Sequence, residues 1–192
     1  MFQVRIHGRG GQGAVTAAEL LSVAAFMEDR HAQAFPSFGS ERTGAPVVAF
    51  CRIDDRPIRV REPVMRPDAL VVQDPTLLHQ VNVFEGLRPG GAVLINSPRS
   101  VDELGLGELA GHALTVPATA LAVRHFGRPV PNAVLLGGLA ALTGCVRIES
   151  LGAAVRERFP GELGEANAAA AREAYDHVQK AQREERAHAQ AD

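Results

Sequence analysis

The chain has 192 residues, of which 46% are hydrophobic and 22% are charged, and its formal net charge is −2. These values are typical of one globular domain, and they exclude the basic footprint of a nucleic-acid-binding protein. The sequence has no apolar run of about 18 residues and no charged-then-apolar leader, so we expect no membrane span, no signal peptide and a cytoplasmic location.

Cysteine usage limits the chemistry that the chain can carry. Cys51 and Cys145 lie far apart, each in an apolar stretch. No CxxC or other cluster-ligating spacing is present. We therefore expect two buried free thiols, and neither zinc nor an iron–sulfur cluster in this chain.

The chain begins with a strand, a glycine-rich loop and a helix. Residues 3–7 predict the strand, and an Ala/Leu-rich segment from about Gln12 to Met27 predicts the helix. Between them, the glycine loop (residues 8–13) reads Gly-Arg-Gly-Gly-Gln-Gly and fits G-x-G-x-x-G. Its glycines permit positive φ and close approach, so the loop can aim helix N–H groups at an anion. The alternative is a tight turn that binds nothing.

Two common phosphate sites do not fit this loop. A dinucleotide site needs an acid at the end of the second strand, about 20 residues further on, to hold the ribose. Glu28 and Asp29 instead follow the predicted helix directly, before any strand begins. No Gly-Lys-Ser/Thr follows the loop, which excludes a P-loop.

Residues 36–46 form a second candidate loop, bounded by Pro36 and Pro46. Irregular segments of this length inside a compact domain are usually functional. Arg42 could bind a phosphate or carboxylate through two parallel hydrogen bonds. A solvated loop without a ligand is the alternative.

The middle of the chain predicts a sheet. Residues 47–53 and 58–61 indicate a β-hairpin, and unbroken apolar runs indicate buried parallel strands. Asp74 is the predicted N-cap of a helix over 75–81. The predicted parallel strands cover 69–72, 92–96 and 113–116.

The chain then becomes helical. The predicted helices are 117–126, 132–143 with Asn132 as N-cap, 149–159 and 162–186. Together the elements predict an α/β fold: a Rossmann-like open, mostly parallel sheet with a β-hairpin insertion and C-terminal helices. We expect one domain over residues 1–180 and a polar tail over 181–192. In such sheets ligands lie at the carboxyl ends of the strands, beside the glycine loop.

Catalytic groups are harder to identify. His7 ends the first strand beside the glycine loop, but a structural histidine is the favoured interpretation. We find no Ser/His/Asp or Cys/His pair and no poised pair of carboxylates. The amide of Asn132 either caps its helix or reaches a ligand. The residues thus predict a chain that binds a ligand and does not catalyse alone.

The glycine loop and the residues that follow it, through Leu21, resemble the start of the gamma subunit of pyruvate:ferredoxin oxidoreductase and related 2-oxoacid:acceptor oxidoreductases. Further matching segments follow in the family's order and extend the resemblance to about residue 180. They are 32–36, 39–47, 52–59, 73–78 and 132–137.

The resemblance implies a division of labour. Such enzymes convert a 2-oxoacid and coenzyme A into an acyl-CoA, carbon dioxide and two electrons. Thiamine diphosphate, Mg²⁺ and [4Fe–4S] clusters belong to the alpha, beta and delta partner subunits, and the gamma subunit is a non-catalytic coenzyme A-binding part, not active alone. Carried over by position, the expected coenzyme A contacts are Gly8, Arg9, Gly10, Gly11, Gln12, Gly13, Arg42 and Asn132, with the loop of Arg42 facing a partner subunit or the assembled active site.

The resemblance leaves several points open. Pyruvate is the favoured substrate, and 2-oxoglutarate, branched-chain or aromatic 2-oxoacids such as phenylglyoxylate are alternatives. Ferredoxin or an NAD-reducing subunit accepts the electrons. The competing hypotheses are a free-standing nucleotide-dependent enzyme and a scaffold subunit whose loop binds nothing.

Overall fold

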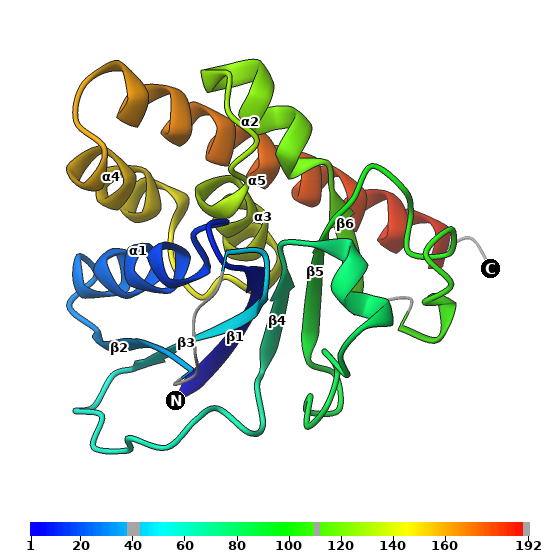
Figure 1. The fold of residues 1–192 in the computed structure, drawn as a ribbon, viewed down its shortest axis with the longest axis horizontal. Coiled ribbons are helices and arrows are strands. Elements are labelled where there is room, and N and C mark those ends of the chain that lie inside the picture. Colours follow the sequence, from blue (N-terminus) through cyan, green and yellow to red (C-terminus); the bar gives the residue numbers. More distant parts are fainter. Residues whose placement is uncertain (38–42, 110–111, 190–192) are drawn as a thin grey trace.

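A computed structural model of the chain describes residues 1–37, 43–109 and 112–189. Six strands form one sheet in the order β2-β3-β1-β4-β5-β6, and helices cover it (Figure 1). The elements are β1 (Phe2–Arg9), α1 (Ala14–Phe26), β2 (His31–Pro36), β3 (Pro46–Asp54), β4 (Ala69–Val72), η1 (Pro75–His79), β5 (Ala92–Asn96), η2 (Gly107–Leu109), β6 (Ala113–Val116), α2 (Ala118–Phe126), α3 (Asn132–Thr143), α4 (Ile148–Arg158) and α5 (Glu162–Ala189).

Strand pairing confirms the predicted fold class. β1, β4, β5 and β6 pair in parallel, while β3 lies antiparallel between β1 and β2. The helix α1 therefore makes a crossover from β1 to the parallel strand β2, with one antiparallel strand inserted between them. The predicted strands over 69–72, 92–96 and 113–116 match β4, β5 and β6.

The predicted β-hairpin of residues 47–53 and 58–61 is wrong: only its first strand exists, as β3. β3 pairs with β2 on one side and β1 on the other, so neither edge of β3 is left for residues 58–61. That stretch has no regular structure, although its alternation of apolar residues and arginine is typical of a strand. The predicted helix over 75–81 is the short 3-10 helix η1, with Asp74 as its cap as predicted.

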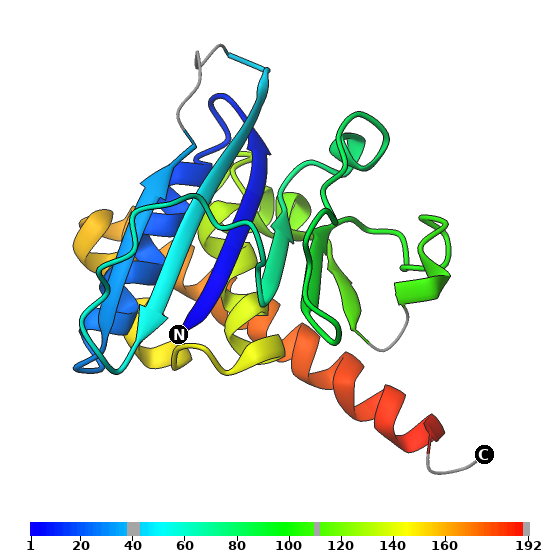
Figure 2. The same cartoon turned by 90° about the horizontal axis from the view of Figure 1, so that it is seen from below.

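The two faces of the sheet are covered differently. The helices α1 and α3 pack on one face, and α4 and α5 lie against them. On the opposite face, η1 and irregular segments cover a smaller apolar cluster formed by Leu70, Val72, Val93 and Ile95. Figure 2 shows the irregular connection from β3 to β4 crossing this opposite face. One face is thus fully helical, and the other is left to connecting segments.

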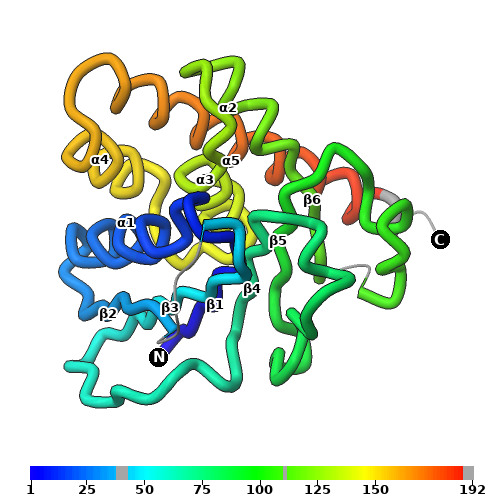
Figure 3. Tube along the Cα trace, in the orientation of Figure 1, coloured from blue at the N-terminus to red at the C-terminus, as the bar shows by residue number. Residues whose placement is uncertain are grey.

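The last helix is longer than predicted. α5 continues to Ala189, so residues 181–189, expected to begin a polar tail, are helical. It runs past α4, α3, α2 and β6 (Figure 3). Its contact with α3 requires Gly137, because a Cβ there would lie 1.9 Å from the Ala171 carbonyl oxygen. No helix in the described part of the chain is long and apolar enough to cross a membrane.

Candidate functional site

The glycine loop connects the carboxyl end of β1 to α1, at the place in the sheet where ligands of open α/β proteins bind. Gly11 has φ +92° and Gly13 has φ +74°, conformations that favour glycine. Gly13 is the N-cap of α1 and offers no side chain to the helix N–H groups. Gly8 lies close to another element, since a Cβ there would lie 2.5 Å from Oε1 of the buried Gln73 and would displace that side chain.

Arg9 holds the loop in place. Its Nε donates to Oδ2 of Asp74 at 2.9 Å, and Nη1 donates to the Gly44 carbonyl at 3.0 Å. Its Nη2 donates to Thr76 Oγ1 at 2.6 Å and to Gln80 Oε1 at 2.9 Å. These four hydrogen bonds occupy most of the guanidinium, which has five N–H donors in total. Arg9 therefore links the glycine loop to η1 and its flanking residues.

Gln12 and Gly10 are also engaged within the protein. Gln12 Oε1 accepts from the Arg9 amide at 2.8 Å, and Nε2 donates to Asp74 at 3.0 Å. Gly10 N–H donates to the Ala45 carbonyl at 2.9 Å. Partial burial alone would raise the pKa of Asp74, but hydrogen bonds from Thr76, Gln12 and Arg9 outweigh it and lower that pKa.

Asn132 brings a second helix start to the same place. The predicted N-cap role is wrong by one position: Pro131 is the N-cap and Asn132 is the first residue of α3. Its Oδ1 accepts from the Ala133 amide at 2.8 Å, and its Nδ2 lies 3.5 Å from the Gly13 carbonyl oxygen. A Cβ on Gly13 would lie 2.5 Å from that Nδ2. The starts of α1 and α3 are thus in direct contact.

A cavity of about 210 Å³ opens beside these two helix starts. Gly11, Gly13 and Asn132 line one side of it. Two arginines, Arg128 after α2 and Arg158 at the end of α4, line the other. The remaining lining residues are Thr16, Phe126, Val130, Phe159, Leu163 and Asn167.

The electrostatics of this cavity favour an anion. Neither α1 nor α3 has an acidic residue in its first turn, and neither N-cap residue supplies a side-chain bond, although Asn132 Oδ1 occupies the Ala133 N–H of α3. The first N–H groups of a helix lack partners within the helix and carry a partial positive charge. Arg128 and Arg158 are exposed, and no described carboxylate forms an ion pair with either. Two helix starts and two guanidinium groups together form a site suited to phosphate.

A larger hollow of about 560 Å³ lies at the carboxyl ends of β5 and β6. Its walls include three prolines, Pro75, Pro98 and Pro117, and the start of α2. Its one lining cation, Arg124, forms an ion pair with Glu173. This hollow is therefore less suited to a phosphate than the cavity beside α1.

The structure brings most of the predicted site residues together. Gly11, Gly13 and Asn132 line the cavity, whereas Gly8, Arg9, Gly10 and Gln12 shape the loop. Arg42 lies outside the described residues. The sequence did not identify Arg128 or Arg158; a connector of Gly127, Arg128 and Pro129 just before a predicted helix was the one available signal.

His7 is structural, as the favoured interpretation had it. Its side chain is 6% exposed, and Arg5 Nε donates to its Nε2 at 3.1 Å. Burial, and then the Arg5 charge, lower the pKa of His7 to about 4. The ring is therefore neutral near pH 7, as its role as hydrogen-bond acceptor requires. In residues 1–37, 43–109 and 112–189, no group of three His, Cys, Asp or Glu side chains is placed to hold a metal.

Comparison with known proteins gives consistent results. The model of the family described as pyruvate ferredoxin/flavodoxin oxidoreductase matches residues 3–177. The chain is 50% identical over 178 residues to the "pyruvate/ketoisovalerate oxidoreductases common subunit gamma" of Pyrococcus furiosus, covering 92% of this chain and 96% of that protein. It is 51% identical over 180 residues to the "pyruvate synthase subunit PorC" of Methanothermobacter thermautotrophicus, covering 94% and 97%.

Solved structures share the fold. The crystal structure of pyruvate oxidoreductase subunit PORC from Thermotoga maritima superposes with a TM-score of 0.78 at 37% identity, covering 91% of this chain and 95% of that one. A 2-oxoglutarate:ferredoxin oxidoreductase from Magnetococcus marinus gives a TM-score of 0.73 at 18% identity, a likeness of fold alone. The match covers 94% of this chain and 31% of that longer one.

Proposed function

The chain belongs to the pyruvate ferredoxin/flavodoxin oxidoreductase family as a gamma subunit, and we propose that it binds phosphate groups of coenzyme A for chemistry that other subunits perform. The observation that carries this proposal is the meeting of two helix starts, neither with a side-chain bond from its N-cap residue, with Arg128 and Arg158 around one cavity. Coenzyme A carries a diphosphate and a ribose phosphate, and this constellation suits such groups.

The size of the cavity limits what it holds. About 210 Å³ is below the usual range of about 300 to 1,000 Å³ for a whole cofactor site. One phosphate-bearing part of coenzyme A therefore enters the cavity, and the rest extends over this subunit's surface toward a partner. The Magnetococcus marinus protein of the same fold has a structure with 2-oxoglutarate, coenzyme A and succinyl-CoA bound, which is compatible with a coenzyme A-dependent reaction here.

The roles of the predicted site residues divide accordingly. Gly11, Gly13 and Asn132 contact the ligand through backbone or amide N–H groups. Arg9, with Gln12, positions the loop, because its donors are already used. Arg42 stays a predicted contact from the second loop.

The remaining cofactors belong to the partners. We propose that alpha, beta and delta subunits hold thiamine diphosphate, Mg²⁺ and [4Fe–4S] clusters and pass electrons to ferredoxin or to an NAD-reducing subunit. This chain's part is to bind and orient coenzyme A and to assemble the complex, without a catalytic side chain of its own.

Pyruvate is the proposed substrate, because relatives about half identical to this chain are named for pyruvate oxidoreductase or pyruvate synthase. The Pyrococcus furiosus relative is named as a subunit common to pyruvate and ketoisovalerate oxidoreductases. A shared gamma subunit is compatible with a subunit that binds coenzyme A, the reactant that the two reactions have in common.

Gly11 offers a direct test. It lines the cavity, and a Cβ built there meets nothing within 4 Å. Asp and Asn tolerate positive φ better than other residues and have nearly equal size. In the assembled oxidoreductase, Gly11→Asp should raise the KM for coenzyme A at least about tenfold above Gly11→Asn, because a carboxylate repels the phosphates. The KM for the 2-oxoacid should stay the same. Equal KM values for coenzyme A in the two variants would favour the scaffold hypothesis.

A further inference from the structure

The outer edge of β2 is open. β2 is the last strand on its side of the sheet, and no described strand lies beyond it. Ser37 N–H donates to the Val48 carbonyl at 2.8 Å, in register with the β2–β3 ladder. Because hydrogen-bonded and non-hydrogen-bonded pairs alternate in an antiparallel ladder, Ala32 and Ala34 direct their N–H and C=O groups outward. The edge thus presents the unpaired backbone N–H and C=O groups of two residues, Ala32 and Ala34.

This edge also lacks the usual protection. Exposed edge strands normally carry charges, bulges or proline that prevent pairing with another chain. β2 reads His-Ala-Gln-Ala-Phe-Pro, with no Lys, Arg, Asp or Glu, and its one proline is the last residue. An unprotected edge is a template to which a strand of another chain can add.

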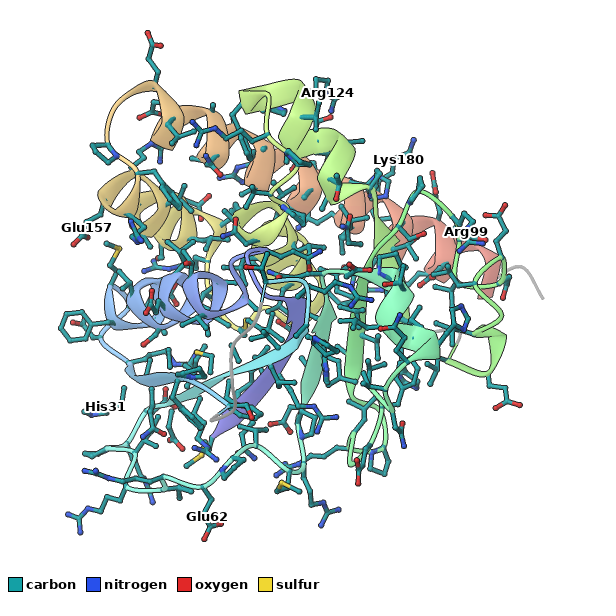
Figure 4. All side chains as sticks on the ribbon, viewed as in Figure 1. His31, Glu62, Arg99, Arg124, Glu157 and Lys180 are labelled. Carbon is teal, nitrogen blue, oxygen red and sulfur yellow. The ribbon has the colours of Figure 1, made fainter. Side chains whose placement is uncertain are left out.

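A charged hollow lies beside the same edge. The crossing segment, residues 55–66, runs over the face on which Gln33 and Phe35 project (Figure 4 labels His31 of β2 and Glu62 of this segment). Between them is a hollow of about 550 Å³ whose cations are Arg59 and Arg61. Its lining residues are Gln33, Phe35, Ile58, Arg59 and Arg61.

A buried arginine anchors the crossing segment at one point. Arg52 is only 1% exposed, and its Nη2 donates to the Glu62 carbonyl. Its Nε and Nη1 donate to Gln3 and Gln33, each at 3.1 Å. Arg59 and Arg61, in contrast, are exposed and form no ion pair with any described carboxylate. Arg52 therefore anchors the segment at Glu62, next to two exposed guanidinium groups that have no ion-pair partner among the described residues.

Apolar surface lies near the same edge, on the opposite, helical face of the sheet. Phe26, at the end of the helix that packs on β2, is 75% exposed, and Val23 and Met27 are each 37% exposed. The β2 edge thus lies between exposed apolar groups on one face and unpaired arginines on the other, and aromatic residues and arginine are enriched in protein interfaces.

We propose that β2 receives an extended acidic segment of another subunit of the oxidoreductase. The added strand pairs with the backbone of Ala32 and Ala34. Every second side chain then points into the hollow, where carboxylates meet Arg59 and Arg61. A second copy of this chain is disfavoured there, since pairing β2 with β2 would bring the arginines of both copies to the same face of the joined sheet. The proposal does not depend on where coenzyme A binds.

Hydrogen–deuterium exchange of the unaltered protein tests the backbone part. In the assembled oxidoreductase, the peptide covering residues 31–36 should gain strong protection relative to the isolated full chain. The peptide covering 58–61 should be protected with it. Unchanged exchange of residues 31–36 on assembly would overturn the proposal.

Charge reversal tests the arginines. The Arg59→Glu, Arg61→Glu double variant is co-expressed with the other subunits in competition with the unaltered chain, and native mass spectrometry counts the incorporated forms. The unaltered chain should be favoured at least about tenfold at low ionic strength, and less in high salt. Arg183→Glu, Arg186→Glu on the exposed end of α5 is the matched control and should compete within about twofold. Equal incorporation of the Arg59/Arg61 variant would refute the proposed role of these arginines.

Photo-crosslinking identifies the occupant. A photoreactive phenylalanine analogue in place of Val60, which is 41% exposed, should join this chain to an acidic peptide of another subunit. Crosslinks solely to a second copy of this chain, or to a peptide without carboxylates, would contradict the proposed occupant.

Discussion

The contact between Gly13 and Asn132 links the two helix starts that form the proposed site, and a double-mutant cycle can measure it. Gly13→Ala places a methyl group at φ +74°, a left-handed conformation that costs an L residue about 1–2 kcal/mol. The new Cβ would also lie 2.5 Å from Nδ2 of Asn132. The Asn132 side chain is buried, and its Oδ1 accepts from the Ala133 amide at 2.8 Å. Moving it leaves buried polar groups without partners, at about 1–3 kcal/mol.

We therefore expect Gly13→Ala to lower the free energy of unfolding of the full chain by about 2–5 kcal/mol, measured by urea denaturation. In an Asn132→Ala background the clash is absent and only the backbone strain remains. There the same substitution should cost about 1–2 kcal/mol, so the cycle should give a coupling of about 1–3 kcal/mol. An equal cost of Gly13→Ala in the two backgrounds would refute the close packing of the two helix starts.

Three further predictions concern the arginines of the site, the buried His7 and the contact between α3 and α5. Arg9→Met should lower the free energy of unfolding by about 2–3 kcal/mol, because it removes four hydrogen bonds. Arg128→Met should instead leave the free energy of unfolding within about 0.5 kcal/mol and raise the KM for coenzyme A several-fold in the complex. The pKa of His7 is about 4 in the folded chain and about 6.5 in the unfolded chain, so protons bind preferentially to the unfolded chain as the pH falls below 6.5. From pH 7 to pH 5, the free energy of unfolding of the unaltered chain should therefore fall by about 2 kcal/mol more than that of His7→Gln, measured by chemical denaturation. Equal pH profiles would count against a buried neutral ring. Gly137→Ala should destabilise the chain by about 3 kcal/mol or more in urea denaturation, because its Cβ would lie 1.9 Å from a carbonyl oxygen of α5. Gly152→Ala, whose Cβ meets only a flexible guanidinium at 3.1 Å, is the control and should be neutral or stabilising.

Local signals in the sequence were sufficient for much of the fold. Unbroken apolar runs predicted β4 and β5, because a strand buried on both faces has no polar side to display. Asp74 was predicted as a cap from its position before Pro75, and its Oδ1 does accept from the Thr76 amide. These features depend on residues close in sequence, which is why patterns reveal them.

The predictions failed where contacts between residues distant in sequence determine the structure. Ile58-Arg59-Val60-Arg61 alternates like a strand, yet β1 and β2 occupy both edges of β3, and the carbonyl of Glu62 binds the buried Arg52. Likewise, no spacing brings Arg128 and Arg158 to the start of α1. Their convergence follows from the packing of α2, α3 and α4 around that start, which the sequence pattern does not encode locally.

The central claim is that coenzyme A phosphates bind beside the starts of α1 and α3. A structure of the assembled oxidoreductase with coenzyme A bound tests it most directly, through distances from the phosphate oxygens to the N–H groups of this chain. The account predicts a phosphate in the cavity, with hydrogen bonds of about 2.9 Å to backbone N–H groups near Gly13 or Asn132 and a guanidinium contact from Arg128 or Arg158. Coenzyme A with all its phosphates on partner subunits, away from this cavity, would contradict the claim.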